Sequence, residues 1–505
     1  MTDKFVIGID SSTQMAKAVA WSRDGKALGE GRAPIPMLRP QEAWCEQEVE
    51  SWWTACKEAL QELGQAVDLS RAAGLAVSNQ RETVGFLDAD GNSVRPGMVW
   101  LDERAAPQVQ RLAKAVGSER LHQITGKPID LTPVAYRLKW MQENEPDNLS
   151  RTAQAVDVQG YLVGQLTGKI AASWTSADPF GTFDLARKTW SPEVLAAIGM
   201  TADQFPPVVR PGTVIGNVTR NAAQATGLPE GLRVIAAGGD GQCAGLGVNA
   251  VGRGIGYLNL GTALIIGAWA EEPRVSLSWR TMSSPTGEGY FLEGVLRAGT
   301  FLVDWVVRNF IGGDTSAEAF ARLEAAARDI PVGAEGLLVS PYLSGCMNPH
   351  WSGEARAAFF GMKPEHGPGH LYRAVLESLT GEVARALQDM RAEGVVVKTI
   401  IAVGGGANST MWLKMISDAT GLPVKVSSSL EASSLGAGMT AAVGLGWYDD
   451  FETAAAGMSS AEDAQSPSDR DRAAWQDLLE RQDRLNRIVV AEAALAKPGK
   501  QVGGA

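Results

Sequence analysis

The sequence predicts an α/β fold made of two domains with the same topology. The chain has 505 residues, whereas one hydrophobic core usually serves about 100–200 residues, so two large domains are expected. An apolar strand, a turn with small and hydroxyl-bearing side chains, and a second strand occur at residues 5–21 and again at residues 256–269. Because each copy lies near the start of one half, this repetition predicts an internal duplication of the fold.

The composition argues against several classes of function. The formal net charge is −11, which disfavours a general binder of nucleic acid or anionic membranes. The four cysteines show neither metal-ligand spacing nor a disulfide framework, so a reducing compartment is expected. No signal-peptide pattern opens the chain, and no apolar run reaches the roughly 18 residues of a membrane span. A soluble, cytoplasmic protein without nucleic-acid or membrane partners is predicted.

Polar side chains follow several apolar segments of the first half. Asp10 and Thr13 come after the strand predicted at residues 5–9, and residues 78–83 (Ser-Asn-Gln-Arg-Glu-Thr) come after the strand predicted at residues 73–77. Asp102 and Arg104 follow the apolar residues 98–101. Ligands of open α/β sheets bind at the carboxyl ends of strands, so one shared pocket is one interpretation. An exposed hairpin tip and a solvated helix start are equally compatible with these patterns.

Asp240 stands at the centre of the sequence argument. Residues 234–247 read V-I-A-A-G-G-D-G-Q-C-A-G-L-G, which is an apolar run, two glycines, one carboxylate and then small residues that can open a helix. Glycine allows the backbone to approach a ligand closely, and a helix start offers unpaired N–H groups. An ordinary turn is the alternative reading of Gly-Gly-Asp on its own.

A glycine run occupies the corresponding place in the second half. Residues 399–403 predict a buried strand, residues 404–406 are all glycine, and a helix is expected from about residue 410. Such a loop lets a phosphate-bearing ligand lie against backbone N–H groups, although it also forms ordinary tight turns. It matches neither the dinucleotide fingerprint nor the Walker A pattern. Residues 431–437 open a second small-residue helix, and residues 491–505 are expected to form a disordered tail.

In this order and spacing, the elements resemble the FGGY family of carbohydrate kinases from residue 7 to about residue 451. That family belongs to the two-domain, actin-like (ribonuclease H-like) group of ATP-binding proteins. The resemblance implies an N-terminal domain at residues 1–249 that binds mainly sugar, a C-terminal domain at residues 250–490 that binds mainly ATP, and an interdomain cleft. ATP and Mg²⁺ are the implied cofactors, a small sugar or polyol is the implied partner, and a homodimer is possible.

The resemblance also assigns roles to individual residues. Asp240 corresponds to the catalytic base, and Asp10 to the carboxylate that organises Mg²⁺ through water, with Asp240 as a possible second metal contact. The residues implied on the phosphate and adenosine side are Thr13, Lys17, Gly261, Thr262, Gly405, Gly406 and Asn408. Those implied to bind the substrate are Arg81, Glu82, Trp100, Asp102, Arg104, Asp240 and Gln242.

The chain departs from the family pattern beside two of these residues. The first hairpin carries Ser12 where glycine is usual and Gln14 where serine or threonine is usual, which puts its phosphate contacts in question. Gly241 follows Asp240 where many members have asparagine or glutamine, and Gln242 stands one residue later.

The motifs favour a pentulose, with D-xylulose as the best guess. Residues 44–47, 176–182, 341–356 and 373–378 resemble xylulokinase-type members, whereas residues 79–83 and 290–294 resemble the glycerol kinase branch. Glycerol or another short polyol is therefore the alternative acceptor. A non-metabolic actin-like or chaperone-like ATPase is a remote alternative, because no segment is left over for a partner-binding domain. A scaffold that binds sugar without catalysis is disfavoured by Asp10, Asp240 and Thr262.

Overall fold

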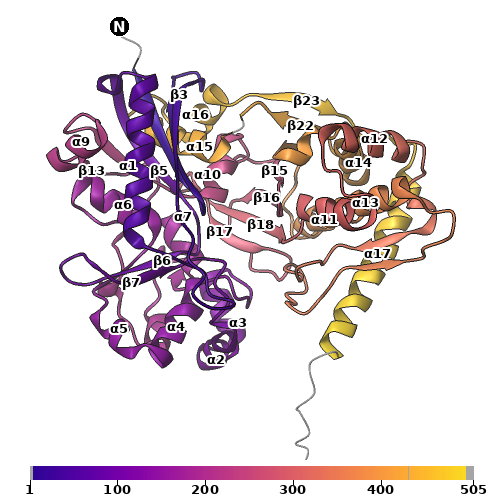
Figure 1. Cartoon of the computed structure of the whole chain (residues 1–505), viewed down its shortest axis with the longest axis horizontal. Coiled ribbons are helices and arrows are strands. Elements are labelled where there is room, and N and C mark those ends of the chain that lie inside the picture. The colour runs from indigo at the N-terminus through magenta and orange to yellow at the C-terminus, as the bar shows by residue number, and fades with distance from the viewer. Residues whose placement is uncertain (1–3, 430, 496–505) are drawn as a thin grey trace, which may run out of the picture.

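The computed structural model describes residues 4–429 and 431–495, which form two lobes (Figure 1). Each lobe is built on one large mixed sheet. The N-terminal lobe (residues 4–239) has the strand order β13 (Val214–Asn217), β14 (Arg233–Gly239), β5 (Ala72–Asn79), β1 (Phe5–Ser11), β2 (Met15–Trp21) and β3 (Ala27–Pro34). The C-terminal lobe (residues 255–429 with 461–495) has the order β23 (Ala461–Gln465), β22 (Val424–Ser427), β21 (Thr399–Val403), β15 (Ile255–Leu260), β16 (Leu264–Ala270), β18 (Tyr290–Leu296) and β17 (Arg280–Ser283).

The two sheets share one topology. In the N-terminal lobe, β1 pairs antiparallel with β2 and parallel with β5, and β5 pairs parallel with β14. In the C-terminal lobe, β15 pairs antiparallel with β16 and parallel with β21, and β21 pairs parallel with β22. The predicted hairpins are thus β1–β2 and β15–β16, which hold equivalent central places. The α/β fold with a duplicated architecture is confirmed.

Helices cover one face of each sheet from within the same lobe. The N-terminal sheet is covered by α1 (Val49–Ala66), α6 (Val158–Thr167) and α9 (Arg220–Thr226). The C-terminal sheet is covered by α11 (Thr300–Phe310), α13 (Pro368–Ala392) and α14 (Thr410–Thr420). Outside them lie α12 (Ala317–Ala327), the strands β19 (Leu338–Ser340) and β20 (Ala358–Phe360), and α17 (Arg472–Leu495), which packs against β19, α13 and α14. These buried layers fix the strand ends that carry the candidate site residues.

The N-terminal lobe also has an outer part with its own apolar core. Its four-stranded sheet consists of β4 (Glu46–Gln47), β7 (Ser93–Met98), β6 (Val84–Leu87) and β8 (Gln154–Val156). Its other elements are α2 (Ala106–Val116), α3 (Ser118–Thr125), α4 (Val134–Asn144), α5 (Pro146–Arg151), α7 (Trp174–Ala177), α8 (Pro192–Ala197) and the strand pairs β9 (Ala172–Ser173) with β12 (Val208–Val209) and β10 (Phe183–Asp184) with β11 (Thr189–Trp190).

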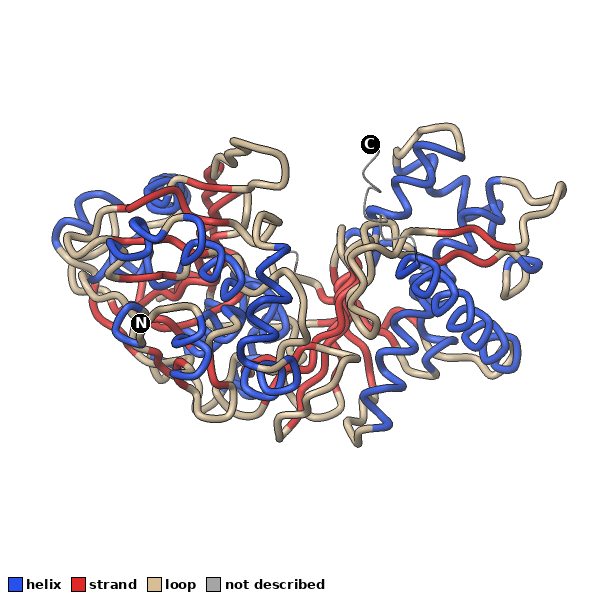
Figure 2. The backbone as a smooth tube through the Cα atoms, turned by 90° about the horizontal axis from the view of Figure 1, so that it is seen from below, coloured by secondary structure: helices blue, strands red, loops and turns tan. Residues whose placement is uncertain are grey.

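Two helices cross from one lobe to the other and cover the remaining sheet faces. Helix α10 (Asp240–Gly247) follows β14 of the N-terminal lobe but shares a core cluster with Tyr257 and Ile401 of the C-terminal sheet. Helix α15 (Ala432–Gly444) follows β22 of the C-terminal lobe but packs on the N-terminal sheet against Val6 and Val19. Both helices lie where the lobes meet (Figure 1), and Figure 2 shows the two lobes from below. Because each helix packs on the sheet of the other lobe, the two helices hold the lobes in contact.

The crossing requires glycine at its contact points. A Cβ atom at Gly436 of α15 would lie 1.9 Å from the carbonyl oxygen of Cys243, and one at Gly247 of α10 would lie 2.0 Å from that of Ala432. Both neighbours are backbone atoms, which cannot turn away as a side chain can. The small-residue runs predicted after residues 240 and 431 are therefore the surfaces along which the two helices touch.

The predicted domain limits need one correction, at the tail. Helix α17 continues to Leu495, so residues 491–495 are helical rather than part of a disordered tail, and residues 496–505 lie outside the described residues. The segment that holds α15 and α16 (Phe451–Met458) falls within the predicted C-terminal domain but packs on the N-terminal sheet. The two helices bury their apolar side chains against β1, β2 and β14, although they follow the C-terminal lobe in the sequence. Within the described residues, no helix is long and apolar enough to cross a membrane.

Candidate active site

Three neighbouring strands bring the candidate residues of the N-terminal lobe to one edge of its sheet. Asp10 on β1 is in register with Ser78 on β5, and Asn79 on β5 is in register with Gly239 on β14. Because these three strands are parallel, their carboxyl ends lie side by side. Asp10, Arg81 and Asp240 therefore meet at this edge, as the positions of the polar clusters predicted.

Glycine at the end of β14 directs Asp240 toward the junction of the lobes. Gly238 has a φ of 150°, and a Cβ atom there would lie 1.7 Å from Thr175 Oγ1. Asp240 is the first residue of α10, and its Oδ1 accepts a hydrogen bond of 2.7 Å from the N–H of Gly241. Its side chain keeps 36% of its surface exposed. The carboxylate is thus oriented by its own helix start and remains accessible.

Arg81 is the nearest cation to Asp240. Its Nε lies 3.3 Å from Asp240 Oδ1, while its Nη1 lies 2.9 Å from Glu293 Oε2 and 3.3 Å from Gln242 Oε1. Burial raises the pKa of Asp240, and the Arg81 charge partly offsets this rise. A carboxylate with a raised pKa holds a proton more strongly, which is the property that a general base needs.

Glu293 and Glu82 connect Arg81 to a second arginine. Glu293 also accepts a hydrogen bond from Arg280, and Arg280 Nη1 lies 2.7 Å from Glu82 Oε1. Glu82 and Arg81 belong to the N-terminal lobe, whereas Arg280 on β17 and Glu293 on β18 belong to the C-terminal lobe. All four side chains are buried. The pair 81–82, predicted to bind the substrate, is thus part of an ionic network between the lobes.

Asp10 lies in the same region at the end of β1. Its Oδ1 accepts a hydrogen bond of 3.0 Å from Ser78 Oγ. Burial, and next the negative charge of Asp240, raise the pKa of Asp10 from its ordinary value of 3.8 to about 7. Both causes disfavour the charged carboxylate, and a bound cation would relieve both. The oxygen donors of Asp10 and Asp240 suit a hard divalent ion.

The first hairpin is held in contact with Trp100 and with the start of α15. Trp100 Nε1 donates a hydrogen bond of 2.9 Å to Thr13 Oγ1, and the Trp100 side chain is among the exposed large apolar groups at 40%. Lys17 Nζ lies 2.7 Å from both carboxylate oxygens of Glu431. Lys17, predicted on the phosphate side, thus has a protein partner from the other half of the chain.

The phosphate-side residues of the C-terminal lobe also meet at one sheet edge. Gly261 and Thr262 form the tip between β15 and β16, and their carbonyl oxygens accept hydrogen bonds of 2.8 Å from the N–H groups of Thr300 and Gly299. The turn Gly405–Asn408 follows β21, which runs parallel to β15. A Cβ atom at Gly405 would meet nothing within 4 Å, whereas one at Gly406 would lie 2.5 Å from the Trp412 ring. Gly405 and Asn408 are exposed at the tip of this turn.

Asp102 and Arg104 do not face a substrate site, contrary to the prediction. Asp102 is fully buried, and its Oδ2 accepts a hydrogen bond of 2.7 Å from the N–H of Cys45. Arg104 Nη2 lies 2.7 Å from Asp102 and 2.6 Å from Glu46, and its guanidinium stacks 3.5 Å from the centre of the Trp44 ring. These charges fasten the loop before β4 to the segment after β7. Both carboxylate oxygens of Asp102, and Nε and Nη2 of Arg104, have partners within the lobe, whereas Arg104 Nη1 is buried without one among the described residues.

Glu293, Arg280 and Glu431 were not singled out by the sequence patterns. Glu293 is 1% exposed in the middle of the apolar strand β18. An acidic residue inside an apolar strand is a signal for a buried partner, because an unpaired buried charge is costly. Residues 290–294 carried that signal, but no neighbouring residue in the sequence identified Arg81 or Arg280 as the partner of Glu293.

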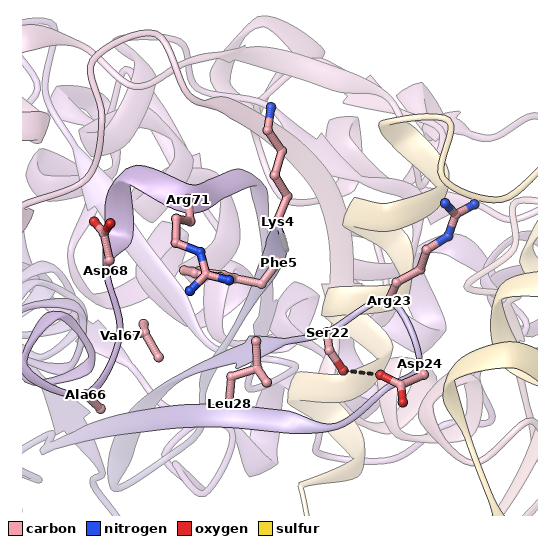
Figure 3. Close-up of a pocket in the computed structure, with 10 residues that line it drawn as sticks. All are labelled: Lys4, Phe5, Ser22, Arg23, Asp24, Leu28, Ala66, Val67, Asp68 and Arg71. Carbon is pink, nitrogen blue, oxygen red and sulfur yellow. Dashed lines mark hydrogen bonds between the residues drawn. The ribbon is translucent and has the colours of Figure 1, made fainter. Parts of the chain in front are cut away.

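A surface pocket lies away from these residues (Figure 3). Lys4 and Phe5, at the start of β1, line it together with Arg71 and Asp68, so it opens at the opposite end of β1 from Asp10. Its lining mixes cations and carboxylates. Among residues 4–429 and 431–495, no group of three or more His, Cys, Asp or Glu side chains could hold a metal ion. Mg²⁺ usually keeps water and phosphate oxygens among its ligands and takes only one or two carboxylates from the protein.

Comparison with known proteins identifies close counterparts of both halves. Residues 5–247 match the N-terminal domain and residues 256–445 the C-terminal domain of the FGGY family of carbohydrate kinases. Xylulose kinase of Bacillus subtilis (strain 168) is 30% identical over 459 residues, which cover 90% of each chain. Gluconate kinase from Lactobacillus acidophilus superposes with a TM-score of 0.93 at 22% identity, covering 98% of this chain and all of the other. Xylulose kinase from the same organism gives 0.92 at 22% identity with the same coverage.

Proposed function

Because the chain belongs to the FGGY family of carbohydrate kinases, we propose that it transfers the γ-phosphate of ATP to a hydroxyl group of a five-carbon ketose such as D-xylulose. The family makes it a phosphotransferase with an alcohol group as acceptor. The ketose is favoured by the curated relative that is 30% identical over nine tenths of both chains and is named xylulose kinase. The two superposed kinases differ in the sugar that they are named for, yet their TM-scores differ by 0.01, so the fold gives no preference.

The observation that carries the proposal is the placement of Asp240. Its carboxylate lies at the junction of the lobes, is partly exposed, and has a pKa raised by burial. Among the described residues, Oδ1 accepts a hydrogen bond from Gly241 and is the oxygen nearest to Arg81, while Oδ2 accepts no hydrogen bond. We assign Oδ2 to accept the proton of the attacking sugar hydroxyl. Phosphoryl transfer asks little more of a protein than such a base and stabilisation of the phosphate charge.

The phosphate side of the proposed site consists of the two hairpin tips and the glycine turn. Thr13, Gly261 and Thr262 would approach the phosphates, and Gly405 with Asn408 would hold the adenosine. Mg²⁺ at Asp10 would supply positive charge to the transferring phosphate. The half-buried carboxylate of Asp10 offers oxygen donors to such an ion, and the charge of the ion would offset the burial and the Asp240 charge that raise the pKa of Asp10. Trp100, whose side chain is exposed, remains as the candidate to contact the sugar, whereas Arg81 and Gln242 are buried and bonded to each other.

Glycerol is the second acceptor to be considered, because residues 79–83 resemble the glycerol kinase branch. The contacts of the pair 81–82 weaken this alternative. Arg81 is engaged by Glu293 and Asp240, and Glu82 by Arg280. A short polyol would have to compete with these buried ion pairs for both side chains.

A screen of acceptors tests the proposal. ADP release is measured with Mg-ATP and a panel of pentuloses, hexuloses, glycerol and tetritols, with Asp240→Asn as the matched control. We expect the largest kcat/KM with a pentulose and formation of its phosphate. A larger kcat/KM with glycerol would replace the ketose in the proposal. ATP hydrolysis that no sugar stimulates would instead favour a non-metabolic ATPase.

A further inference from the structure

We propose that Glu293 and Arg280 of the C-terminal lobe are positioning residues that hold Arg81 so that Asp240 keeps one oxygen free for the acceptor. The inference rests on the proposed function, in which Asp240 is the base. Neither Glu293 nor Arg280 reaches the reacting atoms in this account. They act through the Arg81 guanidinium.

The Glu293 carboxylate is fully used by two arginines. Its Oε2 lies 2.9 Å from Arg81 Nη1, and its Oε1 accepts a hydrogen bond from Arg280 Nη2. With 1% of its side chain exposed, it has no access to water as an alternative partner. A buried carboxylate held from both sides can adopt only a narrow range of positions. It therefore fixes where the Arg81 guanidinium lies.

The orientation of Arg81 determines how much of Asp240 it occupies. Glu293 and Gln242 hold Nη1, and the shortest contact between Arg81 and Asp240 joins Nε to Oδ1 at 3.3 Å. Arginine forms its strongest contacts with a carboxylate through two parallel hydrogen bonds. Without the charge of Glu293, the guanidinium would be free to turn and pair with both oxygens of Asp240. Such a pair would consume the oxygen that the proposed mechanism assigns to the acceptor proton.

The same contacts connect Asp240 to the phosphate side of the C-terminal lobe. Glu293 on β18 is in register with Gly267 on β16, and β16 begins directly after the Gly261–Thr262 tip. A Cβ atom at Gly267 would lie 2.3 Å from the Phe291 ring, so the two strands are closely packed. The ion pairs 81–293 and 82–280 both cross between the lobes, which makes the free oxygen of Asp240 depend on how the lobes are placed.

The test compares Glu293→Gln with an ion-pair variant that does not reach Asp240. The glutamine keeps the size of the side chain and removes its charge. We expect kcat to fall by about 10- to 100-fold when it is calculated from the concentration of protein that binds ATP. The KM for the sugar should change by less than about threefold. Glu293→Asp restores the charge and should recover most of this loss. The control is Asp130→Asn, which breaks another contact between the lobes, to Arg297 at 3.2 Å, and should leave kcat within about twofold.

Folding is followed separately so that the result stays interpretable. Thermal unfolding and ATP binding are measured for each variant. Should Glu293→Gln not fold, the double variant Glu293→Gln with Arg280→Gln keeps the net charge, still releases Arg81, and is expected to show the same loss. A folded Glu293→Gln or double variant with kcat within about twofold of the wild type would overturn the inference. The proposed kinase activity would stand in that case, since the acceptor screen on the wild type and the kcat of Asp240→Asn test it independently of Glu293.

Discussion

The starts of the two crossing helices, α10 and α15, are equivalent in the duplicated fold but differ in their chemistry. Each helix follows a parallel strand of one lobe and packs on the sheet of the other. Asp240 is the first residue of α10, and Glu431 is the residue before α15. Both carboxylates face a cation of the N-terminal lobe, which is Arg81 for Asp240 and Lys17 for Glu431.

The difference lies in how completely each carboxylate is occupied. Both oxygens of Glu431 lie 2.7 Å from Lys17, and 23% of its side chain is exposed. Asp240 receives Arg81 on one oxygen at 3.3 Å, because Glu293 and Gln242 share the guanidinium, and 36% of its side chain is exposed. One position thus serves as a brace between hairpin and helix, whereas the other keeps a free acceptor. We propose that this free oxygen, rather than the equivalent backbone position, suits Asp240 to act as the base.

Removing one charge at each helix start tests most directly whether Asp240 and Glu431 have different roles. Asp240→Asn removes the proposed proton acceptor but keeps the shape of the side chain. We expect kcat for the sugar to fall by about 10²–10⁴-fold, while sugar binding changes little. Steady-state kinetics and equilibrium binding of the sugar measure the two effects. A variant that keeps nearly full kcat would remove Asp240 from the role of base.

Glu431→Gln is the matched control, since it makes the same change of charge at the equivalent place. The amide can still accept a hydrogen bond from Lys17, and the ion pair is partly exposed, so we expect kcat to change by less than about tenfold. A loss as large as that of Asp240→Asn would show that the two helix starts are not chemically distinct.

The second prediction concerns the crossing that makes the two helix starts equivalent. Gly436→Ala would place a Cβ atom 1.9 Å from the Cys243 carbonyl oxygen, so α10 and α15 would have to separate. We expect the free energy of unfolding to fall by about 1–3 kcal/mol or more, and kcat to fall with it because α10 carries Asp240. Chemical denaturation measures the first effect.

Gly252→Ala serves as the control for this change. A Cβ atom at residue 252 would meet nothing within 4 Å, and its backbone does not require glycine. Its free energy of unfolding should stay within about 0.5 kcal/mol of the wild type. Equal destabilisation by both variants would mean that the close helix contact is not what limits stability.

Local patterns were sufficient to predict the fold and one edge of the candidate site. A polar tip between two apolar strands is defined by neighbouring residues, so both hairpins and the place of Asp10 could be predicted. The strand-to-helix position of Asp240 was evident for the same reason. The parallel register that joins Asp10 to Asp240 follows from the topology that the resemblance implied.

Long-range ion pairs could not be predicted in this way. Arg81 and Glu293 are 212 positions apart, and no pattern near either residue names the other. Asp102 and Arg104 show the reverse error, because charges after an apolar segment suggested an exposed site. Their partner Glu46 lies 58 positions from Arg104 and draws both side chains into the lobe. Whether a polar cluster binds a ligand or the protein itself depends on partners that only the folded chain brings together.

The third prediction concerns the pKa of Asp10, which the carboxylates at both helix starts influence. The charge of Asp240 raises the pKa of Asp10 more than that of Glu431 does, and Lys17 acts against them. The folded protein holds this proton up to about pH 7, whereas an unfolded aspartate loses it near its ordinary pKa of 3.8. In the metal-free protein, the contribution of Asp10 to stability should therefore fall as the pH rises from about 4 to about 7.

Denaturant unfolding across this pH range measures the effect against Asp10→Asn, in which that part of the slope should vanish. Asp240→Asn should lower the upper end of the window, because the carboxyl of Asp10 then loses its proton more readily. Glu431→Gln should lower the upper end of the window less, because the charge of Glu431 raises the pKa of Asp10 less than the charge of Asp240 does. Equal shifts in both variants would contradict the unequal coupling of the two helix starts to Asp10. An unchanged slope in Asp10→Asn would assign the titration to another buried carboxyl, such as Glu377, whose pKa burial raises to about 7.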